Sequence, residues 1–246
     1  MSKNFFSIIV DACNQEEWIE RCLNTCLTQR FDNYEVLMSD AISDDKTFEI
    51  AKEYEKNFSH FKVYQHNERL PQIWNIKWLT ELSKPDSIIV SVDGDDWLKN
   101  NKVLKKLNDV YTNDVWMTYG TYEEYPYRDV SDIYVKYPDD VVKNNKFREH
   151  RWLASHLRTY RRELFLKIKD SDFKLPNGKW LDTAGDQAFM LPMLEMAGEK
   201  SRHIPEVLYI YNVANTLRDG TVNAPRQEEV AKYVRSLPKY SKIKNL

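Results

Sequence analysis

The chain has 246 residues and a formal net charge of −2, and it is 42% hydrophobic and 30% charged. This composition is ample for a packed core and excludes an intrinsically disordered chain. General nucleic-acid-binding proteins usually carry a clear basic excess, so we expect no nucleic-acid partner. The length fits one large α/β domain or two small ones.

Membrane and redox signals are weak. No apolar run approaches the roughly 18 to 20 residues of a membrane-spanning helix, and the N-terminus lacks a signal-peptide pattern. The cysteines are Cys13, Cys22 and Cys26, an odd number without a CxxC pair, which favours free thiols in a reducing compartment. We therefore expect a soluble, cytoplasmic protein, and peripheral contact with a membrane stays open.

The first half of the chain alternates between predicted strands and helices. Short apolar, β-branched runs indicate buried strands, and apolar residues at helical spacing indicate helices. The expected strands are Phe5–Val10, Tyr34–Ser39, Phe61–His66 and Ser87–Val92, and the expected helices are Glu16–Thr28, Asp45–Phe58, Ile73–Leu82 and Lys102–Tyr111. This alternation predicts βαβ units around a mostly parallel sheet.

Three of these strands lead into an acidic residue. Asp11 follows the first, Asp40 the second and Asp93 the fourth. Ligands of parallel sheets bind beyond the carboxyl ends of the strands, so these acids are expected at one rim. Asp40 is placed to hydrogen-bond a base or ribose, whereas Ser43, Asp44 or Asp45 is expected to cap the helix that follows.

The fourth strand ends in the sequence VDGDDWL, where Asp93, Asp95 and Asp96 surround Gly94. Glycine permits an unusual backbone angle and the close approach of a ligand. Oxygen ligands without a nearby Cys or His cluster favour a hard cation such as Mg²⁺ or Mn²⁺. The alternative is an acidic turn whose side chains are only solvated.

The second half loses the regular alternation. A strand from Val115 leads into an aromatic, acidic loop that ends at Tyr127, and the polar stretch from Arg128 to Lys146 is expected to be a lid or an insertion facing the acceptor. The remaining expected elements are a helix over His156–Ile168, a helix over Gly185–Gly198 bent near Pro192, and a strand over Glu206–Asn212. From Ala224 a terminal helix and a basic tail are expected. The basic residues of this tail are Lys232, Arg235, Lys239, Lys242 and Lys244, for which a solvated face is favoured over membrane contact.

Order and spacing of these motifs resemble family 2 glycosyltransferases with the GT-A fold, including members from large DNA viruses and bacteria. The resemblance runs from about Phe5 to Asn212. The stretch FSIIVDACNQEEWIERCLNTCLTQRFDNYEVLMSDAISDD is similar to the opening of the family, VDGDDWL to its DxD segment, and GDQAFMLPMLEMAG to the segment with the catalytic acid. It implies a single GT-A (Rossmann-like) domain over 1–223, with a nucleotide-binding half (1–112), an acceptor half (113–223) and a C-terminal helix and tail (224–246).

The resemblance also implies roles for individual residues. The donor-binding set would be Asp11, Ala12, Asn14, Asp40, Asn75, Asp93 and Gly94, with Asp95 and Asp93 at the metal and Asp186 as the general base of an inverting reaction. His156 and Arg158 would lie near an acceptor or a phosphate, with a helix-surface salt bridge as the alternative. Trp152 could stack on an acceptor sugar, since sugar rings present apolar faces to aromatic rings.

The sequence departs from the family pattern at several positions. Ala41 and Ile42 replace the second Asp and the Gly of the family's DDGS segment, and Trp74 replaces the Arg that precedes Asn75. The late His of many relatives is not evident after Asn212, which leaves a third metal ligand open.

The expected function is therefore transfer of a sugar from a nucleotide-sugar, with a UDP-sugar as the expected donor. The acceptor would be a glycan or a lipid-linked or protein-linked group, and the cofactor would be Mn²⁺ or Mg²⁺. Two alternatives remain. One is a catalytically inactive nucleotide-sugar-binding or scaffold protein of the same fold. The other is a DxD phosphohydrolase, which is disfavoured because its motif belongs near the N-terminus and is here preceded by three strands.

Overall fold

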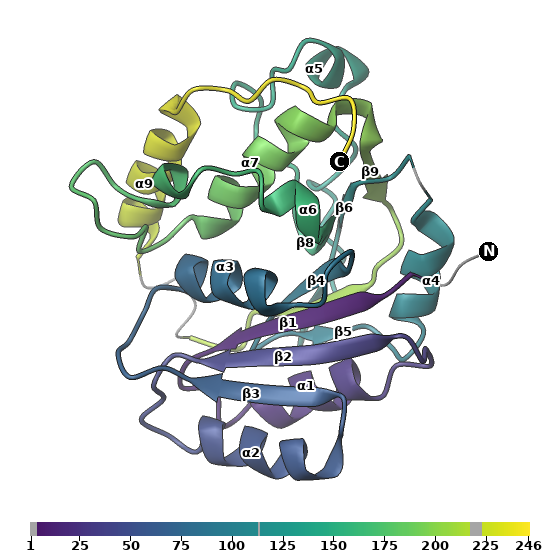
Figure 1. Ribbon diagram of the computed structural model, residues 1–246, viewed down its shortest axis with the longest axis vertical. Coiled ribbons are helices and arrows are strands. Elements are labelled where there is room, and N and C mark those ends of the chain that lie inside the picture. Colours follow the sequence, from purple (N-terminus) through teal and green to yellow (C-terminus); the bar gives the residue numbers. More distant parts are fainter. Residues whose placement is uncertain (1–3, 113, 217–222) are drawn as a thin grey trace.

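The computed structural model describes residues 4–112, 114–216 and 223–246, and its strands form two sheets (Figure 1). The larger sheet contains, in spatial order, β3 (Phe61–Gln65), β2 (Tyr34–Asp40), β1 (Phe6–Ala12), β4 (Ile88–Asp93), β8 (Ser155–Arg161), β6 (Met117–Gly120) and β9 (Ser201–Ile204). The smaller sheet contains β5 (Trp97–Leu98), β10 (Tyr209–Asn212) and β7 (Glu123–Tyr125).

The N-terminal part of the large sheet is parallel, as the sequence predicts. β1 pairs in parallel with both β2 and β4, and β2 pairs in parallel with β3. β8 then runs antiparallel to its neighbours β4 and β6. The mixed α/β class and the mostly parallel sheet are thus confirmed, with β8 as the strand that reverses direction.

Helices cover both faces of this sheet (Figure 1). The helices are α1 (Ile19–Leu27), α2 (Thr47–Asn57), α3 (Gln72–Leu82), α4 (Val103–Val110), α5 (Asp139–Lys143), α6 (Arg162–Phe165), α7 (Gly185–Ala197) and α9 (Ala224–Ser236), with 3₁₀ turns at Asp170–Phe173 and Gly198–Lys200. Alternate residues of β1 explain the two layers. Ile8 and Val10 face the core shared with α1 and α2, whereas Ile9 faces the core shared with α3 and α7.

One predicted helix is wrong. The segment His156–Ile168 begins as strand β8, and only Arg162–Phe165 is helical. β8 lies between two other strands and is buried on both faces, so it lacks the polar–apolar alternation that identifies half-buried strands. His156 and Arg158 therefore project from the middle of a sheet rather than from a helix surface.

The expected capping of α2 is wrong for two of its three candidates. Neither Ser43 nor Asp44 caps this helix; the Asp45 carboxylate accepts the backbone N–H of Thr47, at 2.9 Å. The hydroxyl of Ser43 instead binds Asp40.

The C-terminal segment packs against the second half of the chain. Val230 and Val234 of α9 are buried in the same core as α7, and the Tyr240 N–H donates to the Glu195 carboxylate, at 2.9 Å. The expected solvated face is wrong for Arg235, which donates to the backbone oxygens of Arg148 and His150 at 2.8 Å each. In the described part of the chain, no helix is long and apolar enough to cross a membrane.

Candidate active site

Strand register brings the predicted acids to one edge of the sheet. Asp11 of β1 lies opposite Asp93 of β4, and Ala12 lies opposite Asp40 of β2. Because the three strands are parallel, their carboxyl ends meet there. The expected acidic rim is present.

A cavity of about 960 Å³ lies at this edge. It is lined from both halves of the chain, because β1 and β4 supply one side and β8, α7 and α9 supply others. The predicted site residues that line it are Asp11, Ala12, Asp93, Gly94, Asp95, Trp152, His156, Arg158 and Asp186. Asn14, Asp40 and Asn75 are not among the lining residues.

Position 94 requires a glycine because no side chain fits there, and not because of its backbone angle. Its φ is not positive, which corrects the expected unusual conformation. A Cβ at this position would lie 2.5 Å from the Ala12 Cβ, and the Gly94 N–H donates to the Asp11 carbonyl, at 2.9 Å. The missing side chain therefore lets the β4 turn pack directly against β1.

The carboxylates of this turn are held by residues that the sequence analysis missed. Gln72 at the start of α3 donates to Asp93, at 3.1 Å, and Asn215 donates to Asp95, at 2.7 Å. Asp96 is buried and accepts the backbone N–H of Asn212, at 2.7 Å. Asn212 ends β10 and Asn215 follows it, in the segment after which the sequence shows no late His.

The opposite wall carries Asp186 in the first turn of α7. Arg158 of β8 donates to its Oδ2 at 3.0 Å, and its Oδ1 accepts the N–H of Gln187, at 2.8 Å. Arg158 is 9% exposed, and its Nε has no partner in the structure. The salt bridge is thus real, but it lies inside the cavity and not on a helix surface.

His156 lies on the same strand and faces Asp93, with 4.0 Å between Nε2 and Oδ2. Its ring stacks on Tyr209, with centroids 4.4 Å apart. Burial, followed by the charge of Arg158, lowers the pKa of His156 well below its usual value. A neutral imidazole can donate a lone pair to a metal.

The donor set of this corner fits a divalent cation. One ligand atom each from Asp93, Asp96 and His156 lie within 4.8 Å of one another. Asp96 Oδ2 and His156 Nδ1 are buried and have no hydrogen-bond partner. Burial and the neighbouring Asp95 and Asp93 raise the pKa of Asp96 well above its usual value, as expected where carboxylates crowd without a compensating charge.

Asp11 adds another crowded carboxyl group to this corner. Burial, followed by the charge of Asp93, raises the pKa of Asp11 well above its usual value, and its Oδ1 is buried without a partner. Asn75 lies behind it and lowers that pKa through a side-chain hydrogen bond. Asn75 thus supports a cavity residue while being fully buried itself.

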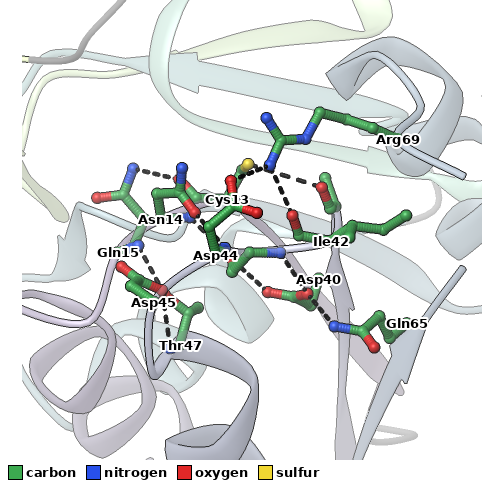
Figure 2. A network of polar contacts seen from close by, with 12 residues as sticks. Cys13, Asn14, Gln15, Asp40, Ile42, Asp44, Asp45, Thr47, Gln65 and Arg69 are labelled. Carbon is green, nitrogen blue, oxygen red and sulfur yellow. Dashed lines mark hydrogen bonds and ion pairs between the residues drawn. The ribbon is translucent and has the colours of Figure 1, made fainter.

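Figure 2 shows the polar network on the β2 side of the cavity. Asp40 is fully buried, and its oxygens accept the Ser43 hydroxyl at 2.5 Å, the Ser43 N–H at 3.0 Å and the Gln65 amide at 2.8 Å. The Asn14 side chain accepts the N–H of Asp44, at 2.8 Å. Asp40 and Asn14 therefore shape the loops beneath this side of the cavity.

Cys13 and Arg69 line the cavity there instead, and the sequence analysis did not select either. Arg69 donates to the Ile42 carbonyl, at 2.7 Å, and to the Asp44 carboxylate, at 2.9 Å (Figure 2). Cys13, Cys22 and Cys26 are free thiols, and the last two are buried on one face of α1, as expected.

Comparison with known proteins agrees with this architecture. Residues 7–169 match glycosyl transferase family 2, and the chain belongs to this family. Its fold is GT-A. S. aureus TarS in complex with UDP-GlcNAc has a TM-score of 0.66 and 22% identity, over 85% of this chain and 58% of that one. The mannosyltransferase PcManGT from Pyrobaculum calidifontis, in complex with GDP-Man and Mn²⁺, has a TM-score of 0.58 and 16% identity, over 85% of this chain and 57% of that one.

Curated relatives are similar over shorter stretches. A dolichyl N-acetyl-alpha-D-glucosaminyl phosphate 3-beta-D-2,3-diacetamido-2,3-dideoxy-beta-D-glucuronosyltransferase from Methanococcus voltae is 35% identical over 106 residues, 40% of this chain and 33% of that protein. Glycosyltransferase GlyA from Streptococcus pneumoniae is 21% identical over 222 residues, 84% of this chain and 30% of that protein. The chain thus spans about a third of the length of these two relatives.

Proposed function

We propose that the protein is a metal-dependent glycosyltransferase that moves a sugar from a nucleotide-sugar, a UDP-sugar, to an acceptor hydroxyl with inversion. The observation that carries this proposal is the shared cavity of the Asp93–Asp95 turn and Asp186. Membership of family 2 favours sugar transfer over a DxD phosphohydrolase. The solved complexes of TarS with UDP-GlcNAc and of PcManGT with GDP-Man support a nucleotide-sugar as the donor class.

Asp93 and Asp95 are the residues we assign to the cation, with Asp96 and His156 as further donors beside Asp93. A bound divalent cation supplies Lewis-acid stabilisation of the charge that develops on the leaving diphosphate. Both Mg²⁺ and Mn²⁺ accept carboxylate ligands, and an imidazole ligand would favour Mn²⁺.

Asp186 is the base that we assign to the acceptor. Arg158 holds one carboxylate oxygen and the Gln187 N–H holds the other, so the carboxylate is fixed in the cavity. It would take the proton of the acceptor hydroxyl as that oxygen attacks the anomeric carbon. A positioned general base typically contributes about 10²- to 10⁴-fold to the rate.

The nucleotide is assigned to the side formed by Asp11, Ala12, Cys13 and Arg69. Asp40 would have to break its hydrogen bonds to Ser43 and Gln65 before it could bind the edge of a nucleobase. The contact between Asp40 and the base therefore stays a prediction. We propose the same nucleotide-binding half (1–112), acceptor half (113–223) and C-terminal segment (224–246) as functional divisions of one domain.

The test is a donor-hydrolysis screen with UDP-, GDP-, dTDP- and CMP-sugars in the presence of Mn²⁺ or Mg²⁺, with a thermal-shift assay of each nucleotide. A nucleotide at 100 times its Kd stabilises the fold by about 2.7 kcal/mol. We expect Asp95→Ala to abolish metal-dependent stabilisation, and Asp186→Asn to keep it but lose transfer. Asp109→Asn, an exposed change on α4, is the matched control.

Each outcome has a clear meaning. Unchanged Mn²⁺-linked stabilisation in Asp95→Ala removes Asp95 as a ligand, and wild-type transfer in Asp186→Asn removes the base. Metal-dependent nucleotide binding without turnover of any donor would establish the non-catalytic alternative.

A further inference from the structure

One wall of the cavity comes from a helix that the sequence analysis placed outside the catalytic domain. Ala224, Gln227, Glu228 and Ala231 of α9 all line the cavity. Their spacing of three, four and seven residues puts them on one helix face. Val230 and Val234 are buried in the core shared with α7, and α9 packs beside α7 (Figure 1). The neighbouring face of α9 lines the cavity.

Arg235 connects this wall to the proposed base. Its Nε donates to the Gln187 side chain at 2.9 Å, directly after Asp186. Its Nη1 donates to the carbonyls of Arg148 and His150, which precede Trp152 in the chain. One half-buried guanidinium therefore fixes α9, the start of α7 and the segment before Trp152 relative to one another.

The charges at this end of the cavity are acidic. Asp182, Asp186 and Glu228 line it, and the basic lining residues in the described chain are Arg158 and Arg69. Arg158 is bonded to Asp186, and Arg69, on the loop between β3 and α3, is bonded to Asp44 of the loop after β2.

The neighbouring cations on α9 are also paired. Arg226 contacts Asp182 at 3.0 Å and Glu229 at 2.8 Å, and Lys232 contacts Glu228 at 2.7 Å. A phosphate entering here would meet carboxylates and cations that are already engaged.

The same wall suits a neutral, hydroxyl-rich ring. Trp152 offers an aromatic face, on which the apolar face of a sugar can stack. Gln227 offers a donor and an acceptor, and Asp182 accepts from hydroxyl groups.

We propose that α9, Trp152 and Asp182 form the acceptor subsite, and that this subsite takes an uncharged saccharide whose hydroxyl is directed toward Asp186. The proposal rests on the proposed function for the role of Asp186. The binding surface itself is defined independently by the cavity wall.

The experiment measures saccharide binding and transfer separately. Saturation-transfer NMR with glucose, galactose, N-acetylglucosamine and glucose 6-phosphate reports binding without a donor. We expect the neutral sugars to give signals and the phosphate ester to give none. Gln227→Ala should weaken saccharide binding about 2- to 10-fold, which corresponds to the loss of one hydrogen bond. Ala231→Leu should prevent binding, because the larger side chain would occupy the space beside α9.

Trp152→Ala should remove the signals, and the ratio of transfer to donor hydrolysis should fall in all three variants. Ser236→Ala is the control, because Ser236 is exposed at the end of the same helix and does not line the cavity. Thermal unfolding of each variant distinguishes a local change from loss of the fold.

Stronger binding of glucose 6-phosphate than of the neutral sugars would overturn the proposal, as would wild-type binding in all three wall variants. If no donor is consumed but the neutral sugars bind and the wall variants lose them, the subsite stands and the proposed function fails. If donor is consumed but the wall variants transfer normally, the function stands and the subsite fails.

Discussion

Gly94→Ala tests whether the contact between β1 and the β4 turn holds the site together. The new Cβ would lie 2.5 Å from the Ala12 Cβ, 3.0 Å from the Asp11 carbonyl oxygen and 3.1 Å from the Ala12 Cα. Non-bonded carbons prefer about 3.5–4.0 Å, so the first contact is about 1 Å too short. None of these neighbours is the end of a flexible side chain.

The strands cannot separate freely to relieve this overlap. β1 and β4 are paired in register from Phe6 opposite Ile88 to Asp11 opposite Asp93. Overpacking of this kind costs about 1–3 kcal/mol. In a domain of this size, 1 kcal/mol lowers Tm by about 2–4 °C, so we expect a decrease of about 2–12 °C.

Differential scanning calorimetry measures this change, and a second substitution tests its cause. Ala12→Gly removes the atom at 2.5 Å and should recover part of the loss when combined with Gly94→Ala. Contacting residues show coupling energies of about 0.5–3 kcal/mol in such a cycle. Ala12→Gly alone is the control, and we expect it to cost about 0.5–1 kcal/mol as a glycine inside a strand.

The same variant should weaken metal-dependent nucleotide stabilisation, because Gly94 lies between Asp93 and Asp95. A wild-type Tm in Gly94→Ala, or additive effects of the two substitutions, would refute the steric argument. Normal Mn²⁺-linked nucleotide binding despite a lowered Tm would show that the turn can move without disturbing its carboxylates.

Three further predictions concern buried polar groups. Glu195→Ala leaves Arg148 as an unpaired buried cation and should cost about 3–5 kcal/mol in chemical denaturation, whereas a loss under 1 kcal/mol would contradict the importance of this pair. Asp40→Asn removes the carboxylate that binds Ser43 and should lower Tm more than it lowers nucleotide affinity; the reverse order would restore Asp40 as a base contact. Burial lowers the pKa of His66, so the unfolded chain binds more protons than the folded one, and stability is lost as pH falls below about 6.5. His66→Phe should therefore reduce the dependence of Tm on pH below about 6.5. An unchanged dependence would assign it to other groups.

The donor side of the site was predictable because it follows from strand order. An acidic residue at the end of a buried parallel strand lies at the carboxyl edge of the sheet, regardless of the loop that follows. Asp11 and Asp93 therefore lie opposite each other, as expected. The same reasoning did not show how Asp40 is held. Sequence position gave the end of β2 correctly, but it did not reveal that Ser43 and Gln65 would engage the carboxylate from two directions.

The acceptor side was less predictable because it depends on long-range packing. Arg158 and Asp186 are 28 positions apart and meet only because β8 is a central strand, which the chain's local pattern did not indicate. α9 was correctly predicted as a helix, yet nothing in its sequence shows that Arg235 reaches Gln187. Local pattern thus identified α9 but not β8, and tertiary contacts decided which faces of these elements line the cavity.

The charges in the cavity connect the two sides. In the described part of the chain, the acidic lining residues Asp11, Asp93, Asp95, Asp182, Asp186 and Glu228 face only two arginines, Arg69 and Arg158. Burial raises the pKa of Asp11 and so favours its neutral form, which leaves the other five as the main source of negative charge. A bare diphosphate would therefore enter a negative site, whereas a diphosphate paired with a divalent cation carries less charge and brings a partner for Asp93 and Asp95. A neutral acceptor escapes this repulsion at the α9 wall. The same excess of carboxylates thus supports both proposals, a divalent cation with the donor diphosphate and an uncharged sugar as the acceptor.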